Sequence, residues 1–157
     1  PLPQAVATQP VPATKPVVPQ AAPPAPLTTA EPSDAQIQAL LEAWLNAKAA
    51  LLAGKTSTIP LAAMASPSQI KRLDAAVAAN QNLGVTEAIT TQIQSFVVDG
   101  RSPNQISATV DLDYSETPLD ASGSPTGPTS TIQLRNRYLF SFDDGTWRLV
   151  SFRRAAG

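Results

Sequence analysis

The sequence predicts an α+β fold, in which N-terminal helices pack on a four-stranded antiparallel sheet to give a cone-like domain. Two observations support this prediction. Apolar residues recur at three- and four-residue spacing over residues 33–54, which is the period of an amphipathic helix. From Ala88 onward apolar and polar residues alternate, which is the period of half-buried strands. Helices followed by an antiparallel meander are typical of α+β domains.

A proline-rich stretch precedes the predicted domain. Residues 1–32 contain ten of the sixteen prolines, and their only charges are Lys15 and Glu31. Prolines at this density hold the backbone near polyproline II and remove hydrogen-bond donors. We therefore expect a disordered, semi-rigid Pro/Ala-rich linker over residues 1–32 and one domain over residues 33–157. Residues 16–19 have P-x-x-P spacing, which leaves open a role for the linker in docking a partner.

The first predicted helix begins after Ser33 and ends near Gly54. Ser33 and Gln36 have the spacing of a capping box, and Gly54 can adopt the left-handed conformation that ends a helix. We expect its apolar stripe, which includes Trp44, to cover the sheet. The stripe consists of Ile37, Leu40, Leu41, Trp44, Leu45, Leu51 and Leu52.

The second predicted helix begins with Ser66 as the N-cap and Pro67 in the first turn. It is expected to extend to about Asn80 and to be terminated by Gly84. Residues 55–58 form a connection, with a short helical turn over residues 59–64.

Four strands are predicted from the alternation of apolar residues. The first stops at residues 99–100, residues 101–104 form a turn, and residues 118–129 form a longer loop. The inward-facing residues expected on the first three strands are Ile89, Thr91, Ile93, Ser95 and Val97, then Ile106, Ala108, Val110, Leu112 and Tyr114, and then Ile132, Leu134, Tyr138, Phe140 and Phe142. Residues 147–153 form the fourth strand.

The turn at residues 144–145 fixes the register of the last two strands. A two-residue Asp-Gly turn places Phe142 opposite Trp147 and Phe140 opposite Leu149. These two pairs are expected to form part of the core.

The loop at residues 118–129 joins the second and third predicted strands, and we place the centre of this hairpin near Ser124. This register places Asp113 opposite Arg135 and Asp111 opposite Arg137, on the face away from the core. The two aspartates are therefore expected to form surface ion pairs, which argues against an acid–base or metal-binding carboxylate pair.

The candidate functional surface is the outer face of the last two strands. Five of the seven arginines lie in the last 23 residues of the chain. An apolar centre surrounded by arginines is typical of a protein-binding patch. The residues assigned to this patch are Arg135, Arg137, Leu139, Arg148, Val150, Phe152 and Arg154. Two alternatives remain: a helix or the proline-rich arm covers the apolar centre, or the arginines bind phosphate or anionic lipid.

Composition excludes several kinds of chemistry. The chain has no cysteine and no histidine, so thiolate chemistry and a His-based triad are impossible. A net charge of −1 argues against a general nucleic-acid binder. We expect no catalytic, cofactor-binding or metal-binding residues. The enzymatic alternative is a pocket between helix and sheet, where Tyr114 or Tyr138 would act with a buried carboxylate.

No run of residues is apolar enough to cross a membrane, so no direct membrane insertion is expected from this segment. The chain begins at Pro1 without a methionine, and we interpret it as the C-terminal part of a longer protein. Any membrane anchor or catalytic domain would then lie upstream.

Two motifs give a family resemblance. With the helical pair and the alternating strand over residues 108–114, W-L-N-A-K at residues 44–48 and D-G-T-W-R at residues 144–148 resemble the IMS-like domain. This domain closes the plastid-division proteins of the accumulation-and-replication-of-chloroplasts family and their cyanobacterial counterparts. The resemblance covers about residues 28–153. The sequence departs from the pattern in a short connection after Gly54, and at Ile70 and Leu73, where relatives often have a Trp.

The resemblance implies a non-catalytic protein–protein interaction domain in a cyanobacterial, membrane-associated assembly, with cell division as the first expectation. The implied partner is the tail of a division or envelope protein, and the implied location is extracytoplasmic, with a cytoplasmic location as the alternative. The departures mean that the family's partner groove cannot be transferred residue by residue. Two alternatives remain: a small-ligand-binding or catalytic cone-shaped domain, and a structural or self-associating terminal domain of a larger kinase or chaperone-like protein.

Overall fold

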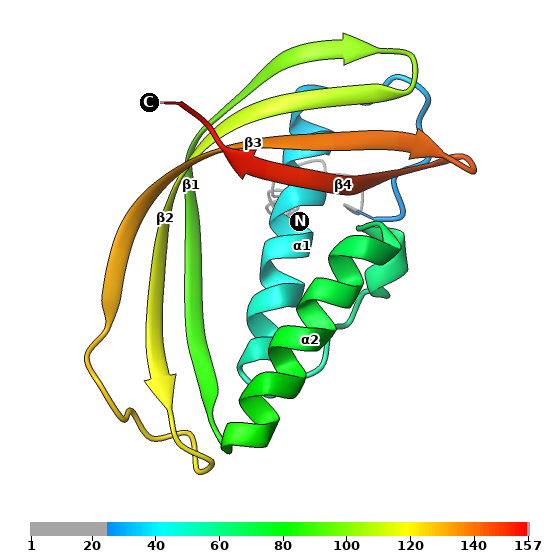
Figure 1. Cartoon of the computed structure of the whole chain (residues 1–157). Helices are drawn as coiled ribbons and strands as arrows, with labels where there is room; N and C mark the ends of the chain where they lie inside the picture. The colour runs from blue at the N-terminus through cyan, green and yellow to red at the C-terminus, as the bar shows by residue number, and fades with distance from the viewer. Residues whose placement is uncertain (1–24, 157) are drawn as a thin grey trace, which may run out of the picture.

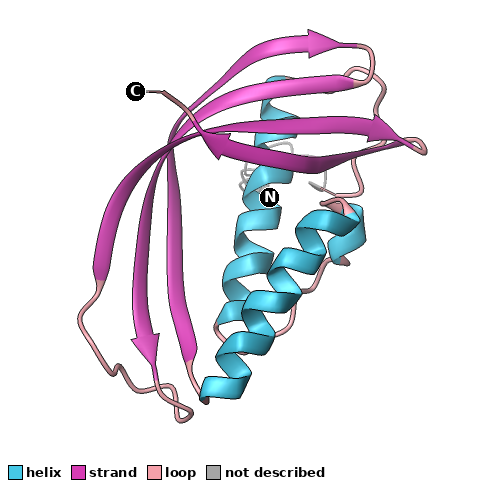
Figure 2. Ribbon diagram, in the orientation of Figure 1, coloured by secondary structure: helices cyan, strands magenta, loops and turns pink. Residues whose placement is uncertain are grey.

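The computed structural model describes residues 25–156. Its two main helices lie against one face of a four-stranded antiparallel sheet of order β1-β2-β3-β4, and the sheet bends around them (Figures 1 and 2). The α+β fold class is therefore confirmed. The elements are α1 (Asp34–Leu52), the 3-10 helix η1 (Leu61–Ala63), α2 (Pro67–Leu83), β1 (Thr86–Ser102), β2 (Gln105–Leu119), β3 (Ser130–Asp143) and β4 (Thr146–Arg154).

The predicted caps of α1 are present, whereas Ser66 stands at the N-cap of α2 without a capping hydrogen bond from its side chain. The Ser33 hydroxyl accepts from the Gln36 backbone N–H, and the Gln36 side chain accepts from the Ser33 backbone N–H, which completes the capping box. Gly54 follows α1 with a φ of 78°. Pro67 opens α2, which continues three residues past Asn80 and ends at Gly84 in the left-handed conformation.

The core lies between α1 and the concave face of the sheet. Trp44 is 4% exposed and packs in one cluster with inward-facing residues of β2, β3 and β4. The Asp144–Gly145 turn has two positive φ angles, which matches the right-handed twist of the strands it joins. The predicted pair of Phe142 and Trp147 forms, with ring centroids 5.2 Å apart.

Two irregularities in β1 correct the predicted inward face of this strand. Ile89, Thr91 and Ile93 face inward as expected, but the pairing with β2 shifts after Ile93 and again after Val98. Each extra residue reverses the side on which later residues lie. Phe96 and Val98 consequently pack on the core, in place of the predicted Ser95 and Val97. Val97 is 58% exposed.

The β2–β3 register differs from the prediction by two residues. Asp111 lies opposite Arg135, and Thr109 lies opposite Arg137. The predicted pairings of Asp113 with Arg135 and Asp111 with Arg137 are therefore wrong. A shift of two residues preserves the face on which each side chain lies, so all four remain on the outer face.

An irregularity in β4 corrects the position of two predicted site residues. Phe140 pairs with Leu149 and Leu139 with Ser151, so Val150 is an extra residue in β4. Phe152 is thereby placed opposite Tyr138 on the inner face, where the two rings stack with centroids 5.6 Å apart. The expected outward position of Phe152 is wrong for this reason.

The free edge of β4 is covered by segments from before and after α1. The backbone N–H of Trp147 donates to the carbonyl of Leu27 (2.9 Å), and that of Leu149 donates to the carbonyl of Met64 (2.9 Å). Leu27 is 5% exposed, and the indole N–H of Trp147 donates to the carbonyl of Thr29. The packed part of the chain thus includes Leu27, six residues before the predicted start of the domain.

Candidate functional site

The predicted patch is divided by the bulge in β4. Arg137 and Leu139 lie on the outer face, and Arg135 forms an ion pair there with Asp111 at 3.2 Å. The Arg148 guanidinium donates to the carbonyls of Ala62 (2.6 Å) and Asp143 (3.2 Å), so it anchors its own chain. The other three predicted residues lie at or beyond the bulge: Val150 is the extra residue, and Phe152 and Arg154 are opposite Tyr138 and Asn136.

A groove of about 620 Å³ is lined by the C-terminal end of β1, the start of β2, the middle of β3 and the C-terminal part of β4, mostly by residues of the outer face. We call it the outer groove. Of the seven predicted patch residues, it contains Arg137, Leu139 and Phe152. Its lining is Gly100, Arg101, Ser102, Gln105, Ser107, Arg137, Tyr138, Leu139, Ser151, Phe152 and Arg153.

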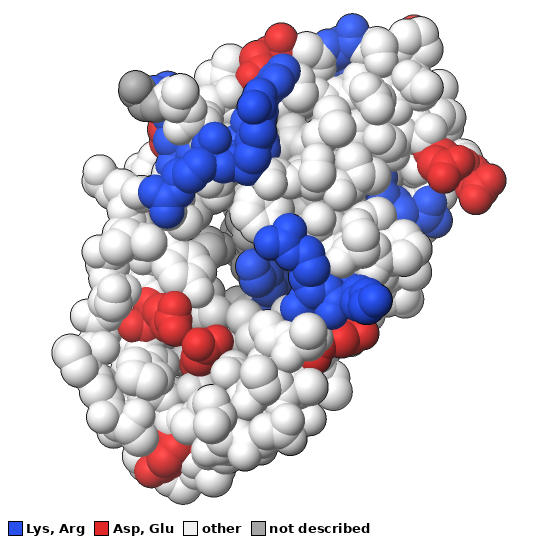
Figure 3. Space-filling model, viewed as in Figure 1, with Lys and Arg blue, Asp and Glu red and all other residues white. Residues whose placement is uncertain are grey.

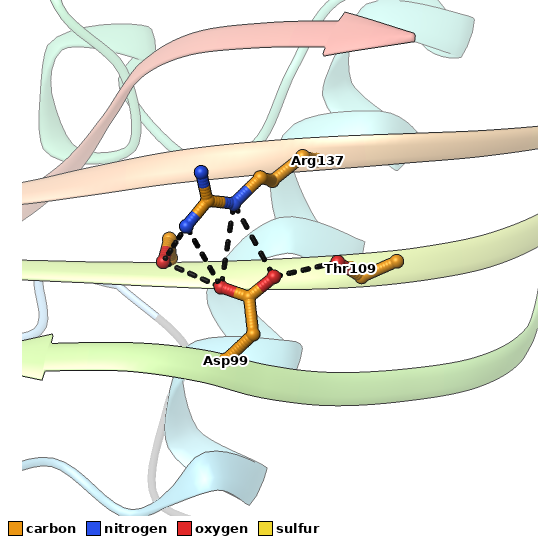
Figure 4. Close-up of polar contacts among 4 residues, drawn as sticks. Asp99, Thr109 and Arg137 are labelled. Carbon is orange, nitrogen blue, oxygen red and sulfur yellow. Dashed lines mark hydrogen bonds and ion pairs between the residues drawn. The ribbon is translucent and has the colours of Figure 1, made fainter. Parts of the chain in front are cut away.

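A carboxylate fixes Arg137 beside this groove. The second extra residue of β1 is Asp99, which accepts from the hydroxyls of Ser107 (2.6 Å) and Thr109 (2.6 Å) and from the Arg137 guanidinium (3.2 Å), as Figure 4 shows. The Ser107 and Thr109 hydrogen bonds, followed by Arg137, lower the pKa of Asp99 to about 2. The network therefore ties β1, β2 and β3 together and orients Arg137.

The rim of the outer groove carries positive charge. Arg153 lies opposite Arg137, is exposed, and forms no ion pair with the described residues. Figure 3 shows basic side chains gathered over the C-terminal end of β4, where Arg154 lies opposite Asn136, outside the groove lining. The lining also contains three serines, Gln105, Leu139 and two aromatic residues, so the groove offers cations, polar groups and apolar side chains to a partner.

Sequence reasoning missed Asp99 and Arg153. Both were hidden by bulges, because the simple alternation that assigns faces fails after an extra residue. The Asp-Gly pair at residues 99–100 predicts the end of a strand, whereas β1 continues to Ser102. A Gly beside a polar residue within a strand pattern is a known signal of a bulge.

The enzymatic alternative can be tested against the inner face. The Tyr114 hydroxyl donates to Glu116 at 3.1 Å, so a carboxylate does share the face of this tyrosine. Burial, followed by the charge of Glu116, raises the pKa of Tyr114. Burial likewise raises the pKa of Tyr138. These shifts make both phenols weaker acids near neutral pH, which does not favour proton transfer by them.

Two further features bear on function. Within residues 25–156, no three acidic side chains lie close enough to hold a metal ion. No helix of the described region is both long and apolar enough to span a bilayer.

Comparisons with known proteins identify similar domains. Residues 37–150 match the model of the family described as "ARC6-like, IMS domain". A search of curated protein sequences found no significant match. The crystal structure of the intermembrane space region of the chloroplast protein ARC6 is similar with a TM-score of 0.65 and 14% sequence identity, and the match covers 81% of this chain and 99% of that chain.

A second solved structure is a putative calcium/calmodulin dependent protein kinase II association domain from Xanthomonas campestris. Its TM-score is 0.51 at 17% identity, and the match covers 83% of this chain and 92% of that chain. At these identities the two structural matches show the fold.

Proposed function

Because the chain belongs to the ARC6-like IMS domain family, we propose that it is a non-catalytic protein-interaction domain of a division-related, membrane-associated assembly. The family is a division-protein domain, and one solved structure similar to this chain is the intermembrane space region of ARC6. An extracytoplasmic location of this domain is part of the proposal.

We assign the interaction to the outer groove and its partner to an acidic segment of a protein. The observation that carries this assignment is the pair Arg137 and Arg153, which lie opposite each other at the groove. Asp99 offsets the charge of Arg137, whereas Arg153 is exposed and unpaired within the described residues. A net positive rim complements carboxylates of a partner and accelerates encounter with them.

Photocrosslinking in cells that produce the protein tests this assignment. A photoreactive amino acid would replace Ser151, which lines the groove, or Lys71, which is exposed on α2. We expect one dominant protein adduct from position 151, identified by mass spectrometry as a division or envelope protein with an acidic segment, and none of that adduct from position 71.

Charge reversal then tests the role of Arg153. Arg153→Glu should remove most of the adduct at position 151, whereas the matched control Lys71→Glu, with the same change in charge, should leave it intact. Equal adducts from both positions, or an adduct that survives Arg153→Glu, would contradict a partner site in the outer groove.

A further inference from the structure

We propose that the pocket between α1 and the sheet binds a short aliphatic monocarboxylate of two to four carbon atoms. This inference does not depend on the proposed function, although Tyr138 and Phe152 line both the pocket and the outer groove. The pocket has a volume of about 70 Å³. Its lining is Trp44, Leu45, Lys48, Ala49, Ile89, Thr91, Leu112, Tyr114, Leu134, Asn136, Tyr138 and Phe152.

Two cations flank one aromatic wall of this pocket. The Lys48 ammonium of α1 lies 5.9 Å from the centroid of the Phe152 ring, and the Arg72 guanidinium of α2 lies 5.5 Å from the same centroid. Among the described residues, neither cation forms an ion pair. Figure 3 shows basic side chains beside the hollow between the helices and the bent sheet.

The position of Lys48 leaves a positive charge in a partly desolvated place. Burial, followed by repulsion from Arg72, lowers the pKa of Lys48, while the charge of Glu87 acts in the opposite direction. Burial, followed by a hydrogen bond with Glu116, raises the pKa of Glu87. An anion bound next to Lys48 would relieve the repulsion between the two cations.

The polar groups of the wall are mainly hydrogen-bond donors. The Lys48 ammonium has three N–H donors and no acceptor capacity. The Asn136 amide nitrogen donates to the Tyr138 hydroxyl at 3.2 Å, and this leaves the Tyr138 proton without an acceptor among the described residues. An ionised carboxylate is an acceptor only, so its hydrogen-bonding pattern complements this wall.

The remaining lining and the volume restrict the ligand. Trp44, Leu45, Ile89, Leu112 and Leu134 provide apolar walls, which suit an alkyl group. A cavity of about 150 Å³ admits benzene, so this pocket holds about three non-hydrogen atoms. Propionate fits these limits with its alkyl carbons inside and its carboxylate at Lys48.

Two-dimensional amide NMR of the full chain titrated with sodium propionate tests the proposal. The chain has two tryptophans: Trp44 lines the pocket, whereas Trp147 lies outside it and donates its indole N–H to Thr29. We expect the indole signal of Trp44 to shift saturably, with a Kd of about 1–10 mM, and that of Trp147 to stay in place. Sodium chloride at equal ionic strength and neutral propionamide should produce no such shift.

Lys48→Met tests the charge that the proposal requires. It should weaken propionate binding about tenfold or more, because a charged hydrogen bond is lost. The matched control Lys71→Met should bind like the unaltered chain. Equal shifts of both indole signals, binding of propionamide as tight as that of propionate, no saturable shift, or full binding by a folded Lys48→Met variant would each overturn the proposal. If Lys48→Met does not fold, the propionamide comparison decides.

Discussion

At the residue scale, Asp99 links the geometry of the outer groove to stability. Its carboxylate accepts hydrogen bonds from two hydroxyls and from Arg137. Because the folded pKa is lowered to about 2 from 3.8, this interaction stabilises the fold at pH values above about 4. The stabilisation is lost as the pH falls from about 4 to about 2.

Asp99→Asn should therefore lower the free energy of unfolding at pH 7 by about 1 kcal/mol, because solvent screens a side chain that is 32% exposed. Urea denaturation at pH 7 and at pH 2 measures this difference, which should shrink to a small part of its value at the lower pH. Asp113→Asn is the control, since Asp113 also lies on the outer face and accepts one hydrogen bond, from Gln94. If Asp99→Asn lowered the free energy of unfolding equally at both pH values, the negative charge of Asp99 would not be the source of the stabilisation.

At the element scale, the bulge in β4 decides which side chains face the helices. Phe152 stacks on Tyr138 because Val150 is the extra residue. Phe152→Ala should lower the free energy of unfolding by about 2 kcal/mol, since a half-buried ring is lost. Val150→Ala should cost less than about 1 kcal/mol.

Urea denaturation measures the free energy of unfolding of both variants, and near-UV circular dichroism follows the aromatic packing. The regular strand expected from the sequence makes the opposite prediction. In that register Phe152 would face solvent, and its truncation would have little effect. A smaller loss for Phe152→Ala than for Val150→Ala would therefore restore that register.

The strands also show why part of the site was not predictable. Alternation identified the inner faces of β2 and β3, and the Asp-Gly turn fixed the first pairs of β3 with β4. Gly100 beside Asp99 signals one bulge of β1, but no such signal marks the extra residues Gln94 and Val150, and in β1 both Ser95/Val97 and Phe96/Val98 fit an alternating pattern. The side on which Arg153 lies depends on Val150 being unpaired, which only the packing of Phe152 on Tyr138 reveals.

At the scale of the whole molecule, the helix-first order and the caps were predictable because they depend on local chemistry. Ser33 and Gln36 cap α1 through bonds within one turn. The start of the packed chain was not predictable in this way. A proline-rich composition indicates a linker whether or not the residues at the end of the proline-rich stretch pack against the sheet. Leu27 docks through contacts with β4, which is about 120 residues away in the sequence.

The segment that carries Leu27 should accordingly stabilise the whole domain. A chain of residues 25–157 retains the buried Leu27 and the bonds from Trp147 to Leu27 and Thr29, whereas a chain of residues 33–157 lacks them. Loss of one buried leucine and two hydrogen bonds should lower the free energy of unfolding by about 3 kcal/mol. Urea denaturation followed by tryptophan fluorescence measures this, since the shorter chain exposes Trp147 and should also shift its emission to longer wavelength.

Leu27→Ala in the longer chain should give about 2 kcal/mol of that loss without changing chain length. If the two chains were equally stable, the domain would begin at Ser33, and the contacts of Leu27 with β4 would contribute nothing to folding.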